Sequence, residues 1–188
     1  MPGYPQYGYP QGGYTVPPPI VPLAPNGMPL AGFGDRFVAY LIDWAVTLGV
    51  AILLLIPTVI GMIAYFATVS ESDLNNSNPF VAIGPVLLIE LGYVLLVGAW
   101  VYVYHVEMFN RTGITWGKRT MKLQILRLND PATPVDRGVL AKRWAVQYLV
   151  GVVVPFWTYI NGLWQLWDKP YQQCLHDKAA GTIVVKAG

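Results

Sequence analysis

Two acidic residues stand inside the long apolar runs of this sequence, where a charge is costly. Asp43 follows Arg36 by seven residues at the start of the first run, and Glu90 stands ten residues into the second. A charged Asp deep in lipid costs ~2.5–3.5 kcal/mol on membrane-insertion scales. Each carboxylate therefore needs protein, water, a counter-charge or a proton, and Asp43 and Glu90 are candidates for an ion or proton site.

Asp43 also has a purely structural interpretation. Seven residues make nearly two helical turns, so Arg36 and Asp43 share one stripe of a helix, separated by ~10 Å of rise. Ala39 on that stripe is small enough to let another helix approach. Asp43 would then fix helix packing through Arg36 or another partner. For Glu90, a proton relay and a neutral hydrogen-bonding group both stay open, with Asp43, a buried water or a bound cation as its partner.

The stretch GITWGKR, from Gly113 to Arg119, is similar to a phosphate-binding loop but does not match one. That loop follows a strand and has Gly-x-x-x-x-Gly-Lys followed by Ser or Thr. Here Gly113 and Gly117 are one position too close, and Arg119 replaces the hydroxyl residue. We expect a basic turn beside anionic headgroups and no nucleotide site.

The stretch CLHDK gathers Cys174, His176 and Asp177 close together in the sequence. Neighbouring residues on an extended chain alternate faces, and a metal site would need further ligands, for which His105 is the only other histidine. We therefore expect no catalytic residue, no metal and no cofactor here. Asp177 is expected to accept hydrogen bonds from the backbone or from an Arg, in a turn at the membrane surface.

The composition predicts an integral membrane protein of the all-α class. The chain has 188 residues, of which 54% are hydrophobic and 12% charged; soluble domains carry about 25% charged residues. The net charge of +2 and the absence of an Arg-rich motif exclude nucleic acid as the expected partner. The single cysteine excludes an internal disulfide. The N-terminus lacks a charged signal region, so the first apolar run is expected to act as an uncleaved membrane signal.

The first 32 residues have a different composition from the rest. Residues 1–32 are rich in Pro, Gly and Tyr, with a loose GYPQ repeat. Pro removes backbone donors and Gly adds backbone entropy, so we expect a disordered tail with polyproline character. It would serve either as a spacer or as a partner-binding arm. Residues 33–188 would form the membrane domain.

Two full transmembrane helices are predicted, at about residues 37–67 and 80–104. Each has more than the ~20 residues that cross a bilayer core. A third apolar run, residues 145–167, is interrupted by Pro155 near its middle. It is compatible with a single span or with a re-entrant helical hairpin.

The distribution of basic residues predicts the orientation. Residues 105–143 are rich in Lys and Arg, whereas the loop between the two spans has neither. The positive-inside rule then places the N-terminus and the basic segment in the cytoplasm of a multi-pass plasma (inner) membrane protein. Two short stretches, residues 122–129 and 182–186, have strand composition. They can pair if both lie on one side, which favours a cytoplasmic C-terminus.

The chain resembles the RDD family of membrane proteins, named for one arginine and two aspartates, over about residues 33–188. Arg36 and Asp43 look like its first two signature positions. The block LHDKAAGTIVV resembles its C-terminal part and makes Asp177 the third position. The stretch TGITWGKRTMKLQILRLND, followed by Arg143, is similar to its middle region. The resemblance implies a bacterial membrane domain with at least two spans, for which transport is usually suggested; the tail looks typical of actinobacterial membrane proteins.

These observations lead to one hypothesis for the site and two for the function. Arg36 would bridge Asp43 and Asp177 in a single charge cluster, since one Arg presents five donors. The chain would transport a cation, a proton or a small solute as a homo-oligomer or with a membrane-protein partner, using Asp43 and Glu90. Alternatively, it is a non-transporting scaffold or accessory subunit that recruits partners through its tail. No nucleophile and base pair is present, so we do not expect an enzyme.

Overall fold

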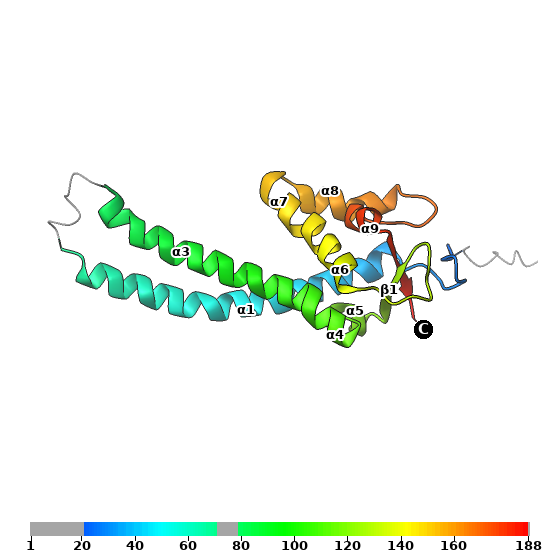
Figure 1. The fold of residues 1–188 in the computed structure, drawn as a ribbon, viewed down its shortest axis with the longest axis horizontal. Helices are drawn as coiled ribbons and strands as arrows, with labels where there is room; N and C mark the ends of the chain where they lie inside the picture. Colours follow the sequence, from blue (N-terminus) through cyan, green and yellow to red (C-terminus); the bar gives the residue numbers. More distant parts are fainter. Residues whose placement is uncertain (1–20, 71–78, 188) are drawn as a thin grey trace, which may run out of the picture.

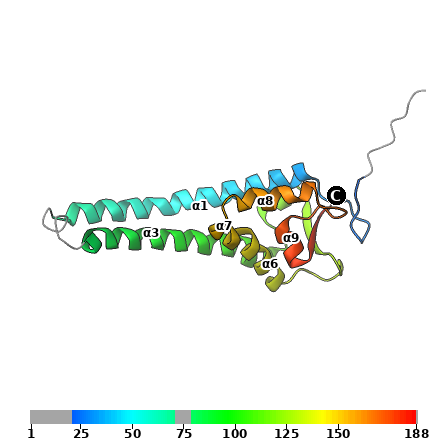
Figure 2. The same cartoon turned by 90° about the horizontal axis from the view of Figure 1, so that it is seen from above.

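Two long helices form the main body of the protein. The computed structural model describes residues 21–70 and 79–187. Helix α1 (Phe33–Thr68) and helix α3 (Pro79–Tyr102) run side by side as an extended hairpin (Figures 1 and 2). Among the described residues, Phe33–Thr68 and Ile83–Thr112 are long and apolar enough to cross a membrane, with 36 and 30 residues. The two predicted spans are thereby confirmed as helices of sufficient length.

The second long helix continues past its predicted end at residue 104. It widens into the π-helical segment η1 (Val103–Met108) and ends in α4 (Phe109–Thr112). Such wider turns are rare and occur frequently at functional sites. A short helix, α5 (Trp116–Thr120), follows and packs against α1.

A small sheet lies at the end of the molecule where α1 begins (Figure 1). Strand β1 (Leu123–Arg127) pairs antiparallel with β2 (Thr182–Lys186), which confirms the predicted pairing. Residues before α1 join this sheet, because the amide of Ala31 donates to the carbonyl of Val184 at 3.0 Å. The folded part of the chain therefore begins before the predicted boundary at Phe33, whereas most of the predicted tail, residues 1–20, lies outside the described residues.

The third apolar run forms a hairpin and not one straight helix. The run begins directly after α6 (Arg137–Trp144). Its first arm consists of η2 (Ala145–Leu149) and α7 (Val150–Val153), and its returning arm of α8 (Trp157–Leu163) and η3 (Trp164–Leu166). The chain reverses beside Pro155, where Phe156 adopts a left-handed backbone with φ of 59°. Helix α9 (Leu175–Ala180) then leads into β2. Of the two forms left open by the sequence, the structure has the hairpin.

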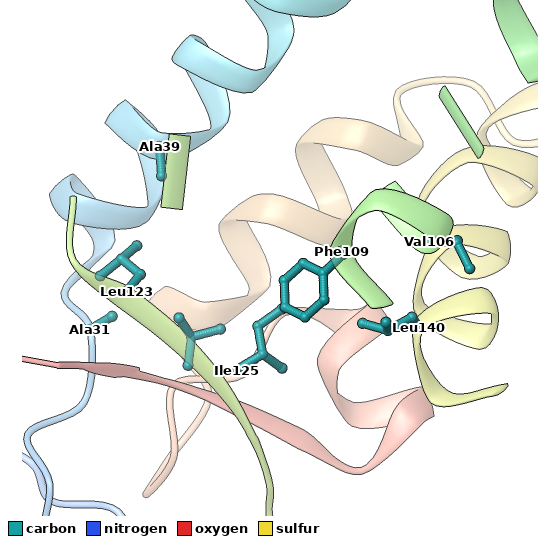
Figure 3. Packing of buried hydrophobic residues seen from close by; sticks show 8 residues of the cluster. Ala31, Ala39, Val106, Phe109, Leu123, Ile125 and Leu140 are labelled. Carbon is teal, nitrogen blue, oxygen red and sulfur yellow. The ribbon is translucent and has the colours of Figure 1, made fainter. Parts of the chain in front are cut away.

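The hydrophobic core lies at the sheet end, where the helices and strands meet (Figure 3). Its buried members come from the segment before α1, the start of α1, the end of the second long helix, α6 and both strands: Ala31, Ala39, Val106, Phe109, Leu123, Ile125, Leu140 and Val184. Farther along α1, large apolar residues such as Leu53 and Ile63 stay exposed. Exposed apolar surface of this extent is typical of a membrane contact.

Candidate functional site

Asp43 is enclosed by donors from two other segments. Its side chain is buried, and Oδ1 accepts hydrogen bonds from Tyr104 Oη at 2.7 Å and from the Gly117 amide at 2.8 Å. Oδ2 accepts from Thr115 Oγ1 at 2.8 Å and lies 3.6 Å from Lys118 Nζ. Three hydrogen bonds and one ion pair thus satisfy this carboxylate within the protein.

The turn that holds Asp43 depends on a close approach between α5 and α1. A Cβ atom on Gly117 would lie 2.0 Å from the carbonyl oxygen of Ala39, so no larger residue fits. The prediction of a simple basic surface turn over GITWGKR is therefore wrong in part. Trp116 is exposed, but the backbone of Gly117 and the amine of Lys118 face Asp43. Burial lowers the pKa of Lys118, an effect that Asp43 partly opposes.

Asp177 is the centre of a second buried cluster. Its Oδ2 accepts from Arg36 Nη1 at 3.3 Å and from the Cys174 amide at 3.2 Å, and its Oδ1 accepts from Arg143 Nη1. Thr182 Oγ1 joins the cluster through Arg143 and Asp177. Burial alone would raise the pKa of Asp177, but the neighbouring Arg143 and Arg36 outweigh it and hold that pKa below its ordinary value.

The single cluster expected from the sequence is divided into two. Arg36 contacts Asp177, as the hypothesis proposed, but its other donors bind the carbonyl oxygens of Ala31 and Val184 at 3.1 and 3.2 Å. Asp43 does not contact Arg36. The physical reason is their separation of nearly two helical turns, which lets each side chain find a partner from a different element.

Glu90 does not join either cluster. It is exposed on α3, and within residues 21–70 and 79–187 it makes no hydrogen bond or ion pair. The structure therefore does not bring Glu90 to Asp43, which was one of the partners considered for it.

Sequence reasoning missed five side chains that complete the two clusters: Tyr104, Thr115, Lys118, Arg143 and Thr182. Arg143 was counted only toward the orientation of the chain and as the end of the family-like middle region. Tyr104 stands at the predicted end of the second span, Thr115 and Lys118 in the expected surface turn, and Thr182 in a predicted strand. The similarity of residues 112–130, Arg143 and residues 175–185 to the family pattern signalled four of these positions, and nothing signalled Tyr104.

A cavity of about 560 Å³ opens between α1, α8 and α9 and reaches both clusters. Arg36, Asp43, Lys118, Arg143 and Asp177 line it, together with the polar side chains of Gln147, Asn161 and Gln165. Another part of its wall is apolar and includes Phe37, Leu41, Trp44 and Leu163. Its volume is within the range of about 300–1,000 Å³ that is typical of small-molecule sites.

The charges along this cavity do not balance. Lys118 pairs with Asp43, but Arg36 and Arg143 share the single carboxylate of Asp177. Arg143 makes its hydrogen bonds within the described ranges through Nη1, so Nε and Nη2 keep three N–H donors for another acceptor. Buried charges are ordinarily paired one to one, and here two guanidinium groups have one carboxylate between them.

The cavity wall also holds a group with metal-ligand chemistry, which fits a metal poorly. Atoms of Cys174, His176 and Asp177 lie within 4.8 Å of one another. Both oxygens of Asp177 already accept hydrogen bonds, and two guanidinium groups oppose a cation there. Burial and Asp177 raise the pKa of the Cys174 thiol to about 12, so the thiolate that a metal binds is disfavoured. We assign no metal to this group.

The largely buried His176, whose side chain is 13% exposed, predicts a loss of stability in mild acid. Burial lowers its pKa from 6.5 to about 3. Between these values the unfolded chain binds a proton that the folded chain does not, so the free energy of unfolding falls as the pH falls through this range. Thermal unfolding in detergent, followed by circular dichroism from pH 8 to 5, should show a falling Tm. His176→Gln should make this profile less steep, with His105 the histidine that remains; an unchanged slope would contradict the assignment.

Asp177 also makes the free energy of unfolding fall as the pH falls, but at lower pH than His176. Its lowered pKa means that the ionised side chain stabilises the fold above the pKa of the unfolded chain, near 4, and that this contribution is lost as the pH falls further. The contribution of Asp177 therefore changes mainly below the pH 8 to 5 range of the measurement, so that range reports on the histidine.

Comparison with known proteins identifies the family of the chain. A family model described as the RDD family matches residues 30–181. No curated protein and no solved structure matches the chain. The matched segment covers most of the 188 residues and contains Arg36, Asp43 and Asp177. The chain therefore belongs to the RDD family of membrane proteins.

Proposed function

We propose that this membrane protein binds a small anionic solute in the cavity between α1, α8 and α9. One observation carries the proposal: the buried Arg36 and Arg143 share one carboxylate, Asp177, beside a cavity of about 560 Å³. An anion in the cavity would take up the free donors of Arg143 and neutralise the remaining charge. Charge-assisted hydrogen bonds of this kind contribute about 1.5–3 kcal/mol each.

The geometry favours this function over a cation or proton site at the intramembrane carboxylates. Asp43 already accepts three hydrogen bonds and pairs with Lys118, so a cation would have to displace these donors. Glu90 is exposed on α3 and far along the helix from Asp43's partners. Transport of the bound solute would be a further step, and two long helices are too few to enclose a path. It would require a homo-oligomer or a membrane-protein partner.

The scaffold alternative and the orientation stay predictions. Residues 1–20, which would recruit a partner, lie outside the described residues. The start of α1 and the C-terminal strand lie at one end of the molecule (Figure 1). This supports placing both on the same side of the membrane, which the distribution of basic residues predicts to be the cytoplasm of a plasma (inner) membrane protein.

Binding of an anion by the purified chain tests the proposed function. In neutral detergent at constant ionic strength, butyl phosphate should raise the Tm in a saturable way, whereas butyltrimethylammonium should not. Arg143→Met removes the unbalanced charge but leaves the Arg36–Asp177 pair, so it should weaken butyl phosphate binding at least tenfold, equivalent to about 1.4 kcal/mol.

Lys142→Met is the matched control. Lys142 is adjacent, exposed and carries the same charge, but it does not line the cavity. It should bind butyl phosphate like the parent. Equal binding by the parent and Arg143→Met, or no saturable anion binding at all, would overturn the proposed function.

A further inference from the structure

We propose that the solute is an anionic amphiphile from the bilayer, with an acyl chain and a headgroup that carries both a phosphate and a hydroxyl donor. This inference rests on the proposed function and names the ligand class of the same cavity. Three features carry it: an apolar wall that continues the lipid-facing surface, an unpartnered buried acceptor among the residues that line the cavity, and a hairpin whose apolar tip extends along the long helices.

The apolar wall is continuous with the membrane-facing side of α1. Phe37, Leu41 and Trp44 line the cavity, and their spacing of four and three residues places them on one stripe of the helix. All three are also exposed, so the cavity is open along this stripe and not closed over it. Leu163 faces the cavity from α8. An acyl chain laid along these side chains would remove apolar surface from water without leaving the membrane-spanning part of α1.

The polar part of the cavity favours a ligand that carries a hydrogen-bond donor as well as a negative charge. Gln165 is 6% exposed and lines the cavity; its Nε2 donates to the Gly162 carbonyl at 2.8 Å, but its Oε1 has no hydrogen-bond partner. A buried acceptor without a partner destabilises the fold, and a ligand that donates to it removes this penalty. A deprotonated carboxylate cannot satisfy it, because it has no donor. A headgroup hydroxyl can donate to Gln165 while the phosphate accepts from Arg143.

The hairpin indicates how such a ligand reaches the cavity. Its tip exposes Val152, Val153 and Phe156 strongly. The tip points along α1 and α3, away from the sheet end (Figure 1). Burying this tip in the bilayer places α8, and the cavity between it and α1, at the level of the headgroups. A lipid can then enter sideways, with its chain toward Trp44 and its headgroup toward Arg143.

A free phosphate compound and a lipid headgroup share this chemistry, so the test separates them. The full chain in neutral detergent would be titrated separately with three ligands: dioctanoyl phosphatidylglycerol, glycerol 1-phosphate, which lacks the acyl chains, and dioctanoyl phosphatidylcholine, which lacks the net negative charge. Native mass spectrometry counts the ligand molecules bound to each chain. Phosphatidylglycerol should bind with one-to-one stoichiometry and at least tenfold more tightly than either of the others. Arg143→Met should abolish this preference, and Lys142→Met should leave it.

The hydroxyl is tested by one further comparison. Dioctanoyl phosphatidate has the chains and the phosphate but no glycerol headgroup. The parent should prefer phosphatidylglycerol, and Gln165→Met, which keeps the size of the side chain, should reduce that preference at least threefold. Circular dichroism checks that each variant is folded.

Each contrary outcome has a distinct meaning. Equal binding of glycerol 1-phosphate and phosphatidylglycerol would overturn the amphiphile and leave the anion site. Equal binding of phosphatidylcholine would show adhesion of lipid in general and overturn the selective site. Absence of binding by every phosphate ligand, butyl phosphate included, would overturn the proposed function together with this inference.

Discussion

Replacing Asp177 by Ala is expected to lower the free energy of unfolding by about 3–5 kcal/mol. The carboxylate is fully buried and is the shared partner of Arg36 and Arg143, so its removal leaves two guanidinium groups without a counter-charge. The amide of Cys174 loses its acceptor as well. Equilibrium unfolding in mixtures of SDS and dodecyl maltoside, followed by circular dichroism, measures the loss.

The exposed pair between Lys186 and Asp35 provides the control. These side chains lie 2.9 Å apart, but they are 46% and 26% exposed, so Asp35→Ala should cost only about 0–1 kcal/mol. Adding Arg143→Met to Asp177→Ala removes one of the unpaired charges and should recover part of the stability, a coupling that a double-mutant cycle detects. If Asp177→Ala costs no more than Asp35→Ala, Asp177 does not hold the two arginines together.

The elements of the fold were largely predictable because their signals are local. Apolar runs longer than ~20 residues identified the two long helices, and short β-branched stretches identified the two strands. The extension of the second long helix past Tyr104 was not predicted. There the apolar run ends, and the helix continues because Val106 and Phe109 pack in the core, which is a tertiary contact.

The partners of the charged residues were less predictable, because they depend on distant segments. Shared helical faces suggested that Arg36 and Asp43 interact, yet Asp43 binds Tyr104 and Thr115, 61 and 72 residues away. Arg143 reaches Asp177 across 34 residues. No spacing rule connects such pairs, and a Lys- and Arg-rich segment offers many equivalent candidates. The family pattern was the informative signal, since it pointed to these positions without giving their contacts.

The motif GITWGKR shows how correct chemistry can be assigned to the wrong ligand. A backbone amide, a hydroxyl and an amine from this turn surround an anion, which is the logic of a phosphate loop. The anion is the carboxylate of Asp43, supplied by α1 of the same chain. These donors of the turn therefore already have an internal partner, which the mismatch in spacing alone did not reveal.

Gly117→Ala is expected to be the other strongly destabilising change, with a loss of about 3 kcal/mol or more. The added Cβ would lie 2.0 Å from the carbonyl oxygen of Ala39, and because that atom belongs to the backbone of α1, the whole of α5 must move away. Overpacking typically costs 1–3 kcal/mol by itself. The movement also lengthens the 2.8 Å hydrogen bond to Asp43, a charge-assisted contact worth about 1.5–3 kcal/mol.

Gly49→Ala is the matched control for this change. Gly49 lies within α1, and a Cβ there meets no atom within 4 Å, so the substitution should stabilise the helix by about 0.5–1 kcal/mol. Unfolding in SDS and dodecyl maltoside compares the two variants directly. If Gly117→Ala unfolds like Gly49→Ala, α5 does not rest on α1. Loss of stability at Gly117 alone would show that the close contact of the two backbones holds α5 against α1, and with it the amide of Gly117 and the amine of Lys118 beside Asp43.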